Sequence, residues 1–139
     1  MDTIDRNLKT TFNNIAEEYD AVRPSYPTEC IDNIIRYSNI QPESKILEIG
    51  CGTGQATHSF LERGYSVDCI DIGSDLISVA KKKFADQKAT FTVSSFEETQ
   101  YPKHSFDLIY CATAFHWIDP EVRYKKAAHL LQPNGTLAL

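Results

Sequence analysis

Three glycines at alternate positions follow a short apolar run in the segment Glu48-Ile49-Gly50-Cys51-Gly52-Thr53-Gly54. Glycine lets the backbone turn sharply, and it lets backbone N–H groups approach a ligand without a Cβ in the way. A tight turn from a strand into a helix uses one or two glycines, so a third favours a ligand-binding loop over a simple turn. Glu48 stands directly before the loop, where a carboxylate suits a cationic ligand better than a pyrophosphate.

Asp71 lies at the end of a second apolar run, roughly twenty residues beyond the glycines. An acidic side chain in this place can accept two hydrogen bonds from the hydroxyls of a ribose. The alternative is a helix cap, a role for which Ser74 is also available. Loop and acid together predict a nucleoside-containing ligand. The dinucleotide fingerprint G-x-G-x-x-G fits poorly, because the third glycine comes one residue early and Gln55 occupies the fingerprint position.

The elements that must position these residues follow from apolar periodicity. The first forty residues are expected to be helical, with one helix before the break at Arg23–Pro27 and a second that begins near Pro27. From Lys45 onward, short apolar strands alternate with helices. The expected strands are 46–49, 67–72, 90–94, 106–111 and 135–139, and the expected helices are 55–63, one that Ser74 caps, and one from Pro120 that ends before Pro133.

Strands that alternate with helices need crossover connections, which produce a parallel sheet with helices on both faces. The predicted fold class is α/β: a doubly wound, mostly parallel, Rossmann-like sheet with N-terminal helices, truncated at the fifth strand. We expect residues 1–40 to form an N-terminal helical segment over the ligand site, and residues 41–139 to form the ligand-binding core of the same domain. Ligands of such sheets bind beyond the carboxyl ends of the strands, so the segments after each strand should carry the chemistry.

Composition limits the partners and the compartment. The 139 residues have a formal net charge of -5, so a basic surface for nucleic acid is not expected. No apolar run approaches the roughly 20 residues that span a membrane, and the polar start is no signal peptide. The four cysteines are scattered without metal-ligand spacing, so we interpret them as reduced residues of a cytoplasmic protein rather than as disulfides or metal ligands. No metal site is expected.

The segment from Glu48 to Gly54 resembles the first motif, E/D-x-G-x-G-x-G, of class I S-adenosylmethionine-dependent methyltransferases. Three later segments agree with that family in the same order: Asp71, Phe106-Asp107-Leu108-Ile109 and Leu131-Gln132-Pro133-Asn134-Gly135-Thr136-Leu137. A narrower likeness, to the methyltransferase type 11 and trans-aconitate methyltransferase-like group, lies in Phe12, Ala16, Tyr19, Arg23-Pro24-Ser25-Tyr26-Pro27 and Phe115-His116-Trp117. The resemblance implies S-adenosyl-L-methionine as the cofactor and a small molecule, often one that bears a carboxylate, as the acceptor.

Carried over to this chain, the family pattern implies a set of cofactor-binding residues: Tyr19, Arg23, Glu48, Gly50, Cys51, Gly52, Gly54, Asp71, Ile72, Ser95, Phe96, Cys111 and Ala112. The glycines would pass under the methionine part and the ribose, Asp71 would hold the ribose hydroxyls, and Ile72 would pack on the adenine. Arg23, with Tyr19, would face the carboxylate of the cofactor; the alternative is a surface arginine beside a turn.

Ser95 stands where the family usually has an acid that accepts from the adenine amino group, so a backbone carbonyl or Glu97 would serve instead. The implied substrate-binding residues are Phe115, His116 and Trp117, which would border the reacting methyl group. Methyl transfer from a sulfonium is a single in-line displacement that needs alignment and exclusion of water more than a protein nucleophile. His116 is either a general base or part of the pocket wall, and no catalytic residue is assigned.

Three functions stay open at this point: an S-adenosylmethionine-dependent methyltransferase acting on a small molecule, a non-catalytic cofactor-binding fragment that needs a partner to complete its fold, and an NAD-dependent oxidoreductase, which the glycine spacing disfavours. The segment from Gly135 to Leu139 is expected at the edge of the sheet, with Leu137 and Leu139 exposed and with no proline, lysine or bulge to protect it. Such an edge pairs readily with another chain, so a homodimer through this strand is expected.

Overall fold

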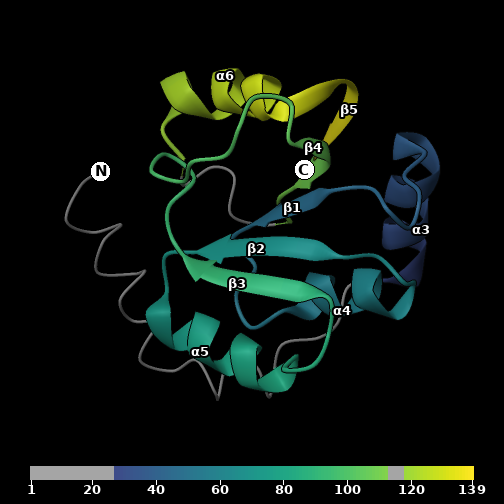
Figure 1. Ribbon diagram of the computed structural model, residues 1–139, viewed down its shortest axis with the longest axis vertical. Coiled ribbons are helices and arrows are strands. Elements are labelled where there is room, and N and C mark those ends of the chain that lie inside the picture. Colours follow the sequence, from purple (N-terminus) through teal and green to yellow (C-terminus); the bar gives the residue numbers. More distant parts are fainter. Residues whose placement is uncertain (1–26, 113–117) are drawn as a thin grey trace.

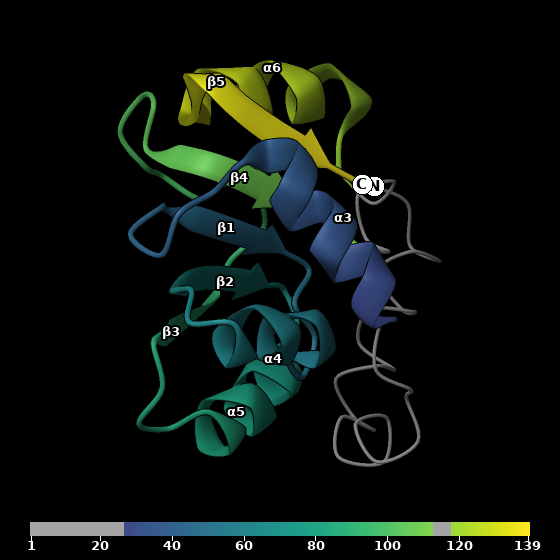
Figure 2. The same cartoon turned by 90° about the vertical axis from the view of Figure 1, so that its right-hand side faces the viewer.

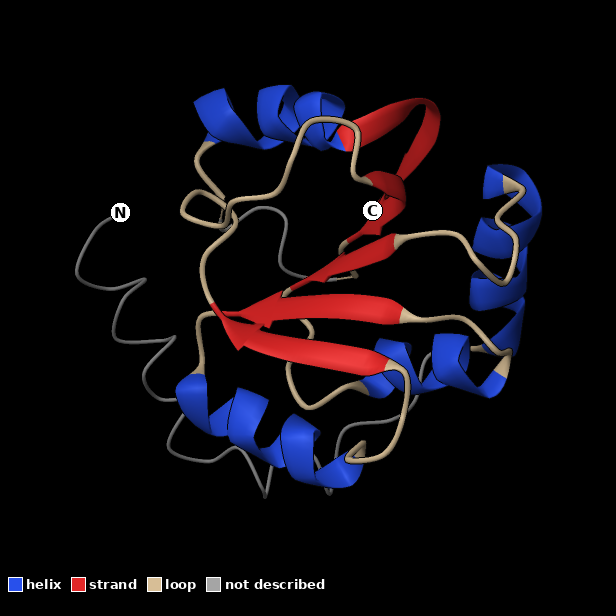
Figure 3. Ribbon diagram, viewed as in Figure 1, coloured by secondary structure: helices blue, strands red, loops and turns tan. Residues whose placement is uncertain are grey.

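The computed structural model describes residues 27–112 and 118–139, which build a five-stranded parallel sheet with helices on both of its faces (Figure 1, Figure 3). The strands are β1 (Ile46–Ile49), β2 (Val67–Asp71), β3 (Ala89–Val93), β4 (Phe106–Tyr110) and β5 (Leu131–Ala138). The helices are α3 (Thr28–Ser38), α4 (Gln55–Glu62), α5 (Ser74–Lys83) and α6 (Pro120–Leu130). The predicted doubly wound α/β fold is confirmed, while the helix expected before Pro27 lies outside the described residues.

The strand order shows where a ligand of this sheet would bind. The order is β3-β2-β1-β4-β5, and every neighbouring pair is parallel. The chain therefore builds outward from β1 in one direction and from β4 in the other, so the switch point lies between these two strands. Ligands of open α/β sheets bind at this point, beyond the carboxyl ends of the strands.

Two apolar clusters hold the helices on the sheet. Helices α3, α4 and α5 pack on one face, through Ile31, Phe60 and Ile77 among others; Figure 2 shows α3 and α4 lying in front of the strands. Helix α6 packs on the opposite face through Ala127 and Leu130. Because helices cover both faces, all four residues of β1 are buried, as is usual for the central strand of a parallel sheet.

Most element boundaries agree with the prediction. Helix α4 ends where Gly64 adopts a φ of +89°, and α6 begins where the Asp119 carboxylate accepts a hydrogen bond of 2.9 Å from the N–H of Glu121. The predicted Ser74 cap is wrong, because Gly73 occupies the N-cap of α5 and Ser74 is the first helical residue. The Asp71 carboxylate accepts from the Gly73 N–H at 2.8 Å, so the preceding acid stabilises this helix start instead.

Strand β5 also differs from the prediction. It begins at Leu131 rather than at Gly135, and it contains Pro133 and a shift in register opposite Phe106–Leu108. Proline is tolerated here because β5 is an edge strand, where the missing N–H leaves no ladder bond unmade. Leu137 is half-buried against the second cluster, whereas Leu139 is 63% exposed. The prediction of an edge without a proline or a bulge is therefore wrong. Of the two leucines predicted to be exposed, only Leu139 is.

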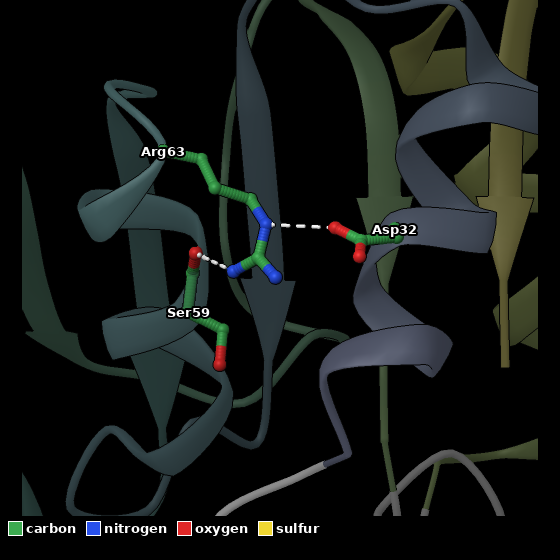
Figure 4. Close-up of polar contacts among 3 residues, drawn as sticks. All are labelled: Asp32, Ser59 and Arg63. Atoms are coloured by element: carbon green, nitrogen blue, oxygen red, sulfur yellow. Dashed lines mark hydrogen bonds and ion pairs between the residues drawn. The ribbon is translucent and has the colours of Figure 1, made fainter.

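Arg63, the residue after α4, ties that helix to α3 (Figure 4). Its Nε lies 3.0 Å from Asp32 Oδ1, and its Nη1 donates to the Ser59 carbonyl at 2.6 Å. We expect Asp32→Ala to lower the free energy of unfolding by less than about 1 kcal/mol, because the ion pair is partly exposed and Arg63 keeps its bond to Ser59. Urea unfolding followed by circular dichroism measures this, with the exposed Asp86→Ala as the control. A loss of more than about 2 kcal/mol would show that the pair holds α3 in place.

Candidate functional site

The glycine loop lies directly on the end of β2. The N–H groups of Gly50 and Cys51 both donate to the Ile70 carbonyl, at 2.8 Å and 3.2 Å. The next glycine, Gly52, donates its N–H to Asp71 Oδ2 at 2.9 Å. Two segments that the sequence analysis assigned separately to the ligand are therefore joined by a hydrogen bond.

The second and third glycines are required for different reasons. Gly52 has a φ of +58°, which favours glycine, and among the described residues the atom nearest to a Cβ built there is Gln55 Oε1, at 3.8 Å. Gly54 has a φ of +98°, and a Cβ there would lie 2.3 Å from a ring carbon of Phe84. Gly54 thus lets Phe84, the residue after α5, pack against the loop, while glycine at position 52 allows the left-handed backbone of the turn.

Asp71 serves the loop and the following helix together. Its Oδ2 accepts from Gly52 and its Oδ1 from Gly73, and the residue is half-buried. The two alternatives for this acid, helix start and ligand contact, are compatible. A carboxylate has about four acceptor positions, so one such group can serve backbone donors and a ligand together. The backbone bonds also fix the orientation of the carboxylate.

Glu48 lies beneath the loop and is only 2% exposed. Its Oε1 accepts hydrogen bonds from the Tyr110 hydroxyl at 2.7 Å and from the Thr57 hydroxyl. A buried carboxylate needs such donors, because burial without them is costly. The sequence analysis missed both hydroxyls. Tyr110 is the register partner of Glu48 on β4, and no spacing in the sequence indicates this pairing.

Three groups near Glu48, namely Tyr110, Cys51 and Cys69, stay protonated at neutral pH. Burial, and then the charge of Glu48, raises the pKa of Tyr110 well above its usual value. The hydrogen bond with Cys69, followed by burial, raises the pKa of the Cys51 thiol, and burial raises the pKa of Cys69. A thiol with a raised pKa is a poor nucleophile, so the loop cysteine contributes packing rather than covalent chemistry. All four cysteines are free in the structure, and three of them are buried.

The residues after β2 and β3 form the far side of the candidate site. Ile72 is 39% exposed, and Val93, the register partner of Asp71, is 50% exposed. Ser95 Oγ accepts from the N–H of Glu98 at 3.1 Å, so this hydroxyl closes the turn that follows β3. The Phe96 side chain is 2% exposed and lies in the apolar cluster under α6, so a ligand would meet this residue through its backbone.

The remaining predicted residues divide into two groups. At the end of β4, Cys111 is buried and donates its N–H to the Ala138 carbonyl, and Ala112 is exposed. Five predicted site residues lie outside the described residues: Tyr19, Arg23, Phe115, His116 and Trp117.

Neither a metal site nor a membrane helix occurs in the part of the chain that the structure describes. Over residues 27–112 and 118–139, no group of three or more His, Cys, Asp and Glu could hold a metal ion. Within the same ranges, no helix is both long enough and apolar enough to span a bilayer.

Comparison with known proteins points to one family. Residues 47–139 match the family described as methyltransferase domain. Over 134 residues, the chain is 30% identical to an uncharacterized methyltransferase of Mycobacterium tuberculosis, an alignment that covers 96% of this chain and 53% of the relative. It is also 32% identical over 136 residues to a malonyl-[acyl-carrier protein] O-methyltransferase of Priestia megaterium, which covers 94% and 49% of the two chains. The chain thus spans about half the length of these relatives.

A solved structure agrees with these sequence relatives. It is the crystal structure of a SAM-dependent methyltransferase from Methanosarcina mazei, which superposes with a TM-score of 0.64 at 28% identity. The match covers 80% of this chain and 55% of that one.

Proposed function

Since the chain belongs to the family of methyltransferase domains, which implies S-adenosylmethionine as its cofactor, we propose that it transfers the methyl group of that cofactor to a small molecule. The observation that supports the proposal most directly is the hydrogen bond between the glycine loop and Asp71. The Gly52 N–H donates to the Asp71 carboxylate at 2.9 Å, from a loop position with a φ of +58° that favours glycine. This arrangement suits a ribose that lies across the loop, with its hydroxyls toward Asp71.

The residues around that link fit the other parts of the cofactor. The buried Glu48 carboxylate lies beneath the loop, where its negative charge favours the cationic methionine end. The exposed Ile72 offers an apolar surface to the adenine, and the turn that contains Ser95 and Phe96 follows the neighbouring strand. We assign the cofactor carboxylate to Arg23 with Tyr19, and the edge of the methyl-transfer region to Cys111 and Ala112.

The chain's part in catalysis is alignment. S-adenosylmethionine supplies an activated methyl group, and the displacement needs no nucleophile from the protein. The protonated thiols near the loop agree with this role, because they add no competing nucleophile. We propose that Phe115, His116 and Trp117 contact the acceptor and exclude water, and we assign no catalytic residue.

The proposed acceptor is a small molecule that carries a carboxylate. The name of the Priestia megaterium relative supports the carboxylate, because it specifies a malonyl group, there on an acyl-carrier protein, and transfer to oxygen. The net charge of -5 supports a small acceptor rather than nucleic acid. We further propose a reducing, cytoplasmic compartment, with which the four free cysteines are compatible.

Calorimetric titration tests the cofactor. We expect S-adenosylmethionine and S-adenosylhomocysteine to bind, and NADH to show no isotherm, because the glycine spacing and Glu48 disfavour a pyrophosphate. A NADH isotherm without one for the methionine derivatives would refute the proposal. Binding without methyl transfer to any carboxylate acceptor would favour the non-catalytic alternative.

We also propose that the chain self-associates through β5. This strand forms one edge of the sheet, and its residues 136–138, beyond Pro133 and the shift in register, can present unpaired N–H and C=O groups to another chain. Sedimentation velocity over a concentration series should show a dimer that Leu139→Lys weakens, because a charge at the edge disfavours pairing. Tyr37→Lys on α3, at a residue that is 84% exposed, is the control and should leave the dimer unchanged. A strict monomer at high concentration would contradict the proposal.

A further inference from the structure

Lys126 of α6 reaches across to the segment between β3 and β4. Its ammonium donates to the Glu97 carbonyl at 3.0 Å and also to the Thr99 carbonyl. The same Nζ lies 5.5 Å from the centre of the Phe96 ring. One side chain therefore contacts three residues of a single turn, from an element that is more than twenty positions away in the chain.

These contacts favour one position of the turn. Bonds from an ammonium to carbonyls are charge-assisted, and contact with an aromatic face adds to them. Burial lowers the pKa of Lys126, with a smaller opposing effect from the Glu97 carboxylate, so the ammonium gives up part of its hydration to hold this position. The neighbouring Lys125 is exposed, which makes it a matched control on the same helix.

The turn that Lys126 holds is tied to the proposed cofactor site at its other end. The Ser94 N–H donates to the Asp71 carbonyl at 2.9 Å, at the point where β2 and β3 end together. The turn is closed on Ser95, whose carbonyl accepts from the Thr99 N–H and whose hydroxyl accepts from the Glu98 N–H. The position of the turn relative to Asp71 therefore depends on a contact made from α6.

We infer that Lys126 is a positioning residue for adenine recognition, which holds the turn of residues 95–99 where its polar groups meet the amino edge of the base. The inference rests on the proposed function, since it concerns the adenine end of the same site. It also accounts for the departure at Ser95. With serine in place of the acid, a backbone carbonyl of the turn or Glu97 is left to accept from the amino group, and either acceptor binds better when the turn is already held in place.

The test compares two ligands that differ at the amino group. S-adenosylhomocysteine carries the 6-amino group of adenine, whereas S-inosylhomocysteine has an oxygen in its place. Lys126→Met keeps the apolar stem beside Phe96 and removes the ammonium, so we expect affinity for S-adenosylhomocysteine to fall about tenfold. Affinity for S-inosylhomocysteine should change less than about twofold, so the preference for adenine is largely lost. Lys126→Arg should retain most of the preference, and Lys125→Met should retain all of it.

Equal losses for the two ligands, or no loss for either, would overturn the role of Lys126. Circular dichroism establishes that each variant is folded. If Lys126→Met does not fold, the two ligands are compared on Lys126→Gln and Lys126→Arg instead. Only the arginine variant keeps the positive charge, so only the glutamine variant should lose the preference for adenine. Failure of the unaltered chain to bind S-adenosylhomocysteine would instead refute the proposed function, and this inference with it.

Discussion

Replacing Gly54 with alanine is expected to lower the free energy of unfolding by about 2–5 kcal/mol. Two costs add: roughly 1–2 kcal/mol for a side chain at a left-handed φ of +98°, and about 1–3 kcal/mol for forcing a methyl group into the Phe84 ring. The ring cannot easily move away, because Phe84 is buried and stacks on Phe91 with ring centres 5.8 Å apart. Denaturant unfolding of the two proteins measures the loss.

Gly64 provides a control that separates the two costs. It has a similar φ of +89°, but a Cβ there would meet nothing within 4 Å. Gly64→Ala should therefore show only the backbone cost of about 1–2 kcal/mol. Adding Phe84→Leu to Gly54→Ala should recover part of the difference, because leucine lacks the outer ring atoms. Equal losses for the two alanine variants would show that the packing of Gly54 against α5 is not tight.

The largest expected effect on binding comes from Asp71→Ala. Loss of two ribose hydrogen bonds to a charged acceptor should weaken S-adenosylhomocysteine binding by about 1.5–3 kcal/mol, which is roughly ten- to a hundredfold. The variant also removes the acceptor for the Gly52 and Gly73 N–H groups, so its stability should fall as well.

Asp68→Ala is the matched control for Asp71. Asp68 lies on the same strand and bonds to Thr90 on β3, at the end of the sheet away from the loop. It should leave the affinity unchanged. If folded Asp71→Ala binds S-adenosylhomocysteine within twofold of the parent, Asp71 does not belong to the site.

The fold was predictable from sequence because its signals are local. Apolar runs of four or five residues marked β1, β2 and β4, and Asp119-Pro120 marked the start of α6. The predicted start of β5, at Gly135, is four residues after its actual start at Leu131, because Gln132, Pro133 and Asn134 are typical of a turn. In the structure they belong to an irregular edge strand, where the neighbouring β4 and the absence of an outer partner in the described sheet permit a proline.

The site was only partly predictable, because its supporting contacts are distant in sequence. The glycine loop and Asp71 form recognisable patterns, and the structure joins them. No spacing rule in the sequence predicts that Thr57 and Tyr110 bond to Glu48. The same holds for the contact of Lys126 with the turn after β3. Such contacts depend on which side chains two packed elements bring together, and local periodicity does not contain this information.

The Glu48–Tyr110 hydrogen bond has a consequence for the order in which the protein folds. It joins residues 62 positions apart, and its acceptor lies directly before the glycine loop. Closing so long a segment has an entropic cost that only late, non-local contacts offset. We therefore expect the loop to reach its full rigidity only after β4 has docked beside β1, although the loop is made much earlier in the chain. On this account, a nascent chain becomes able to hold a nucleoside when its central sheet is assembled, and not when the loop itself emerges.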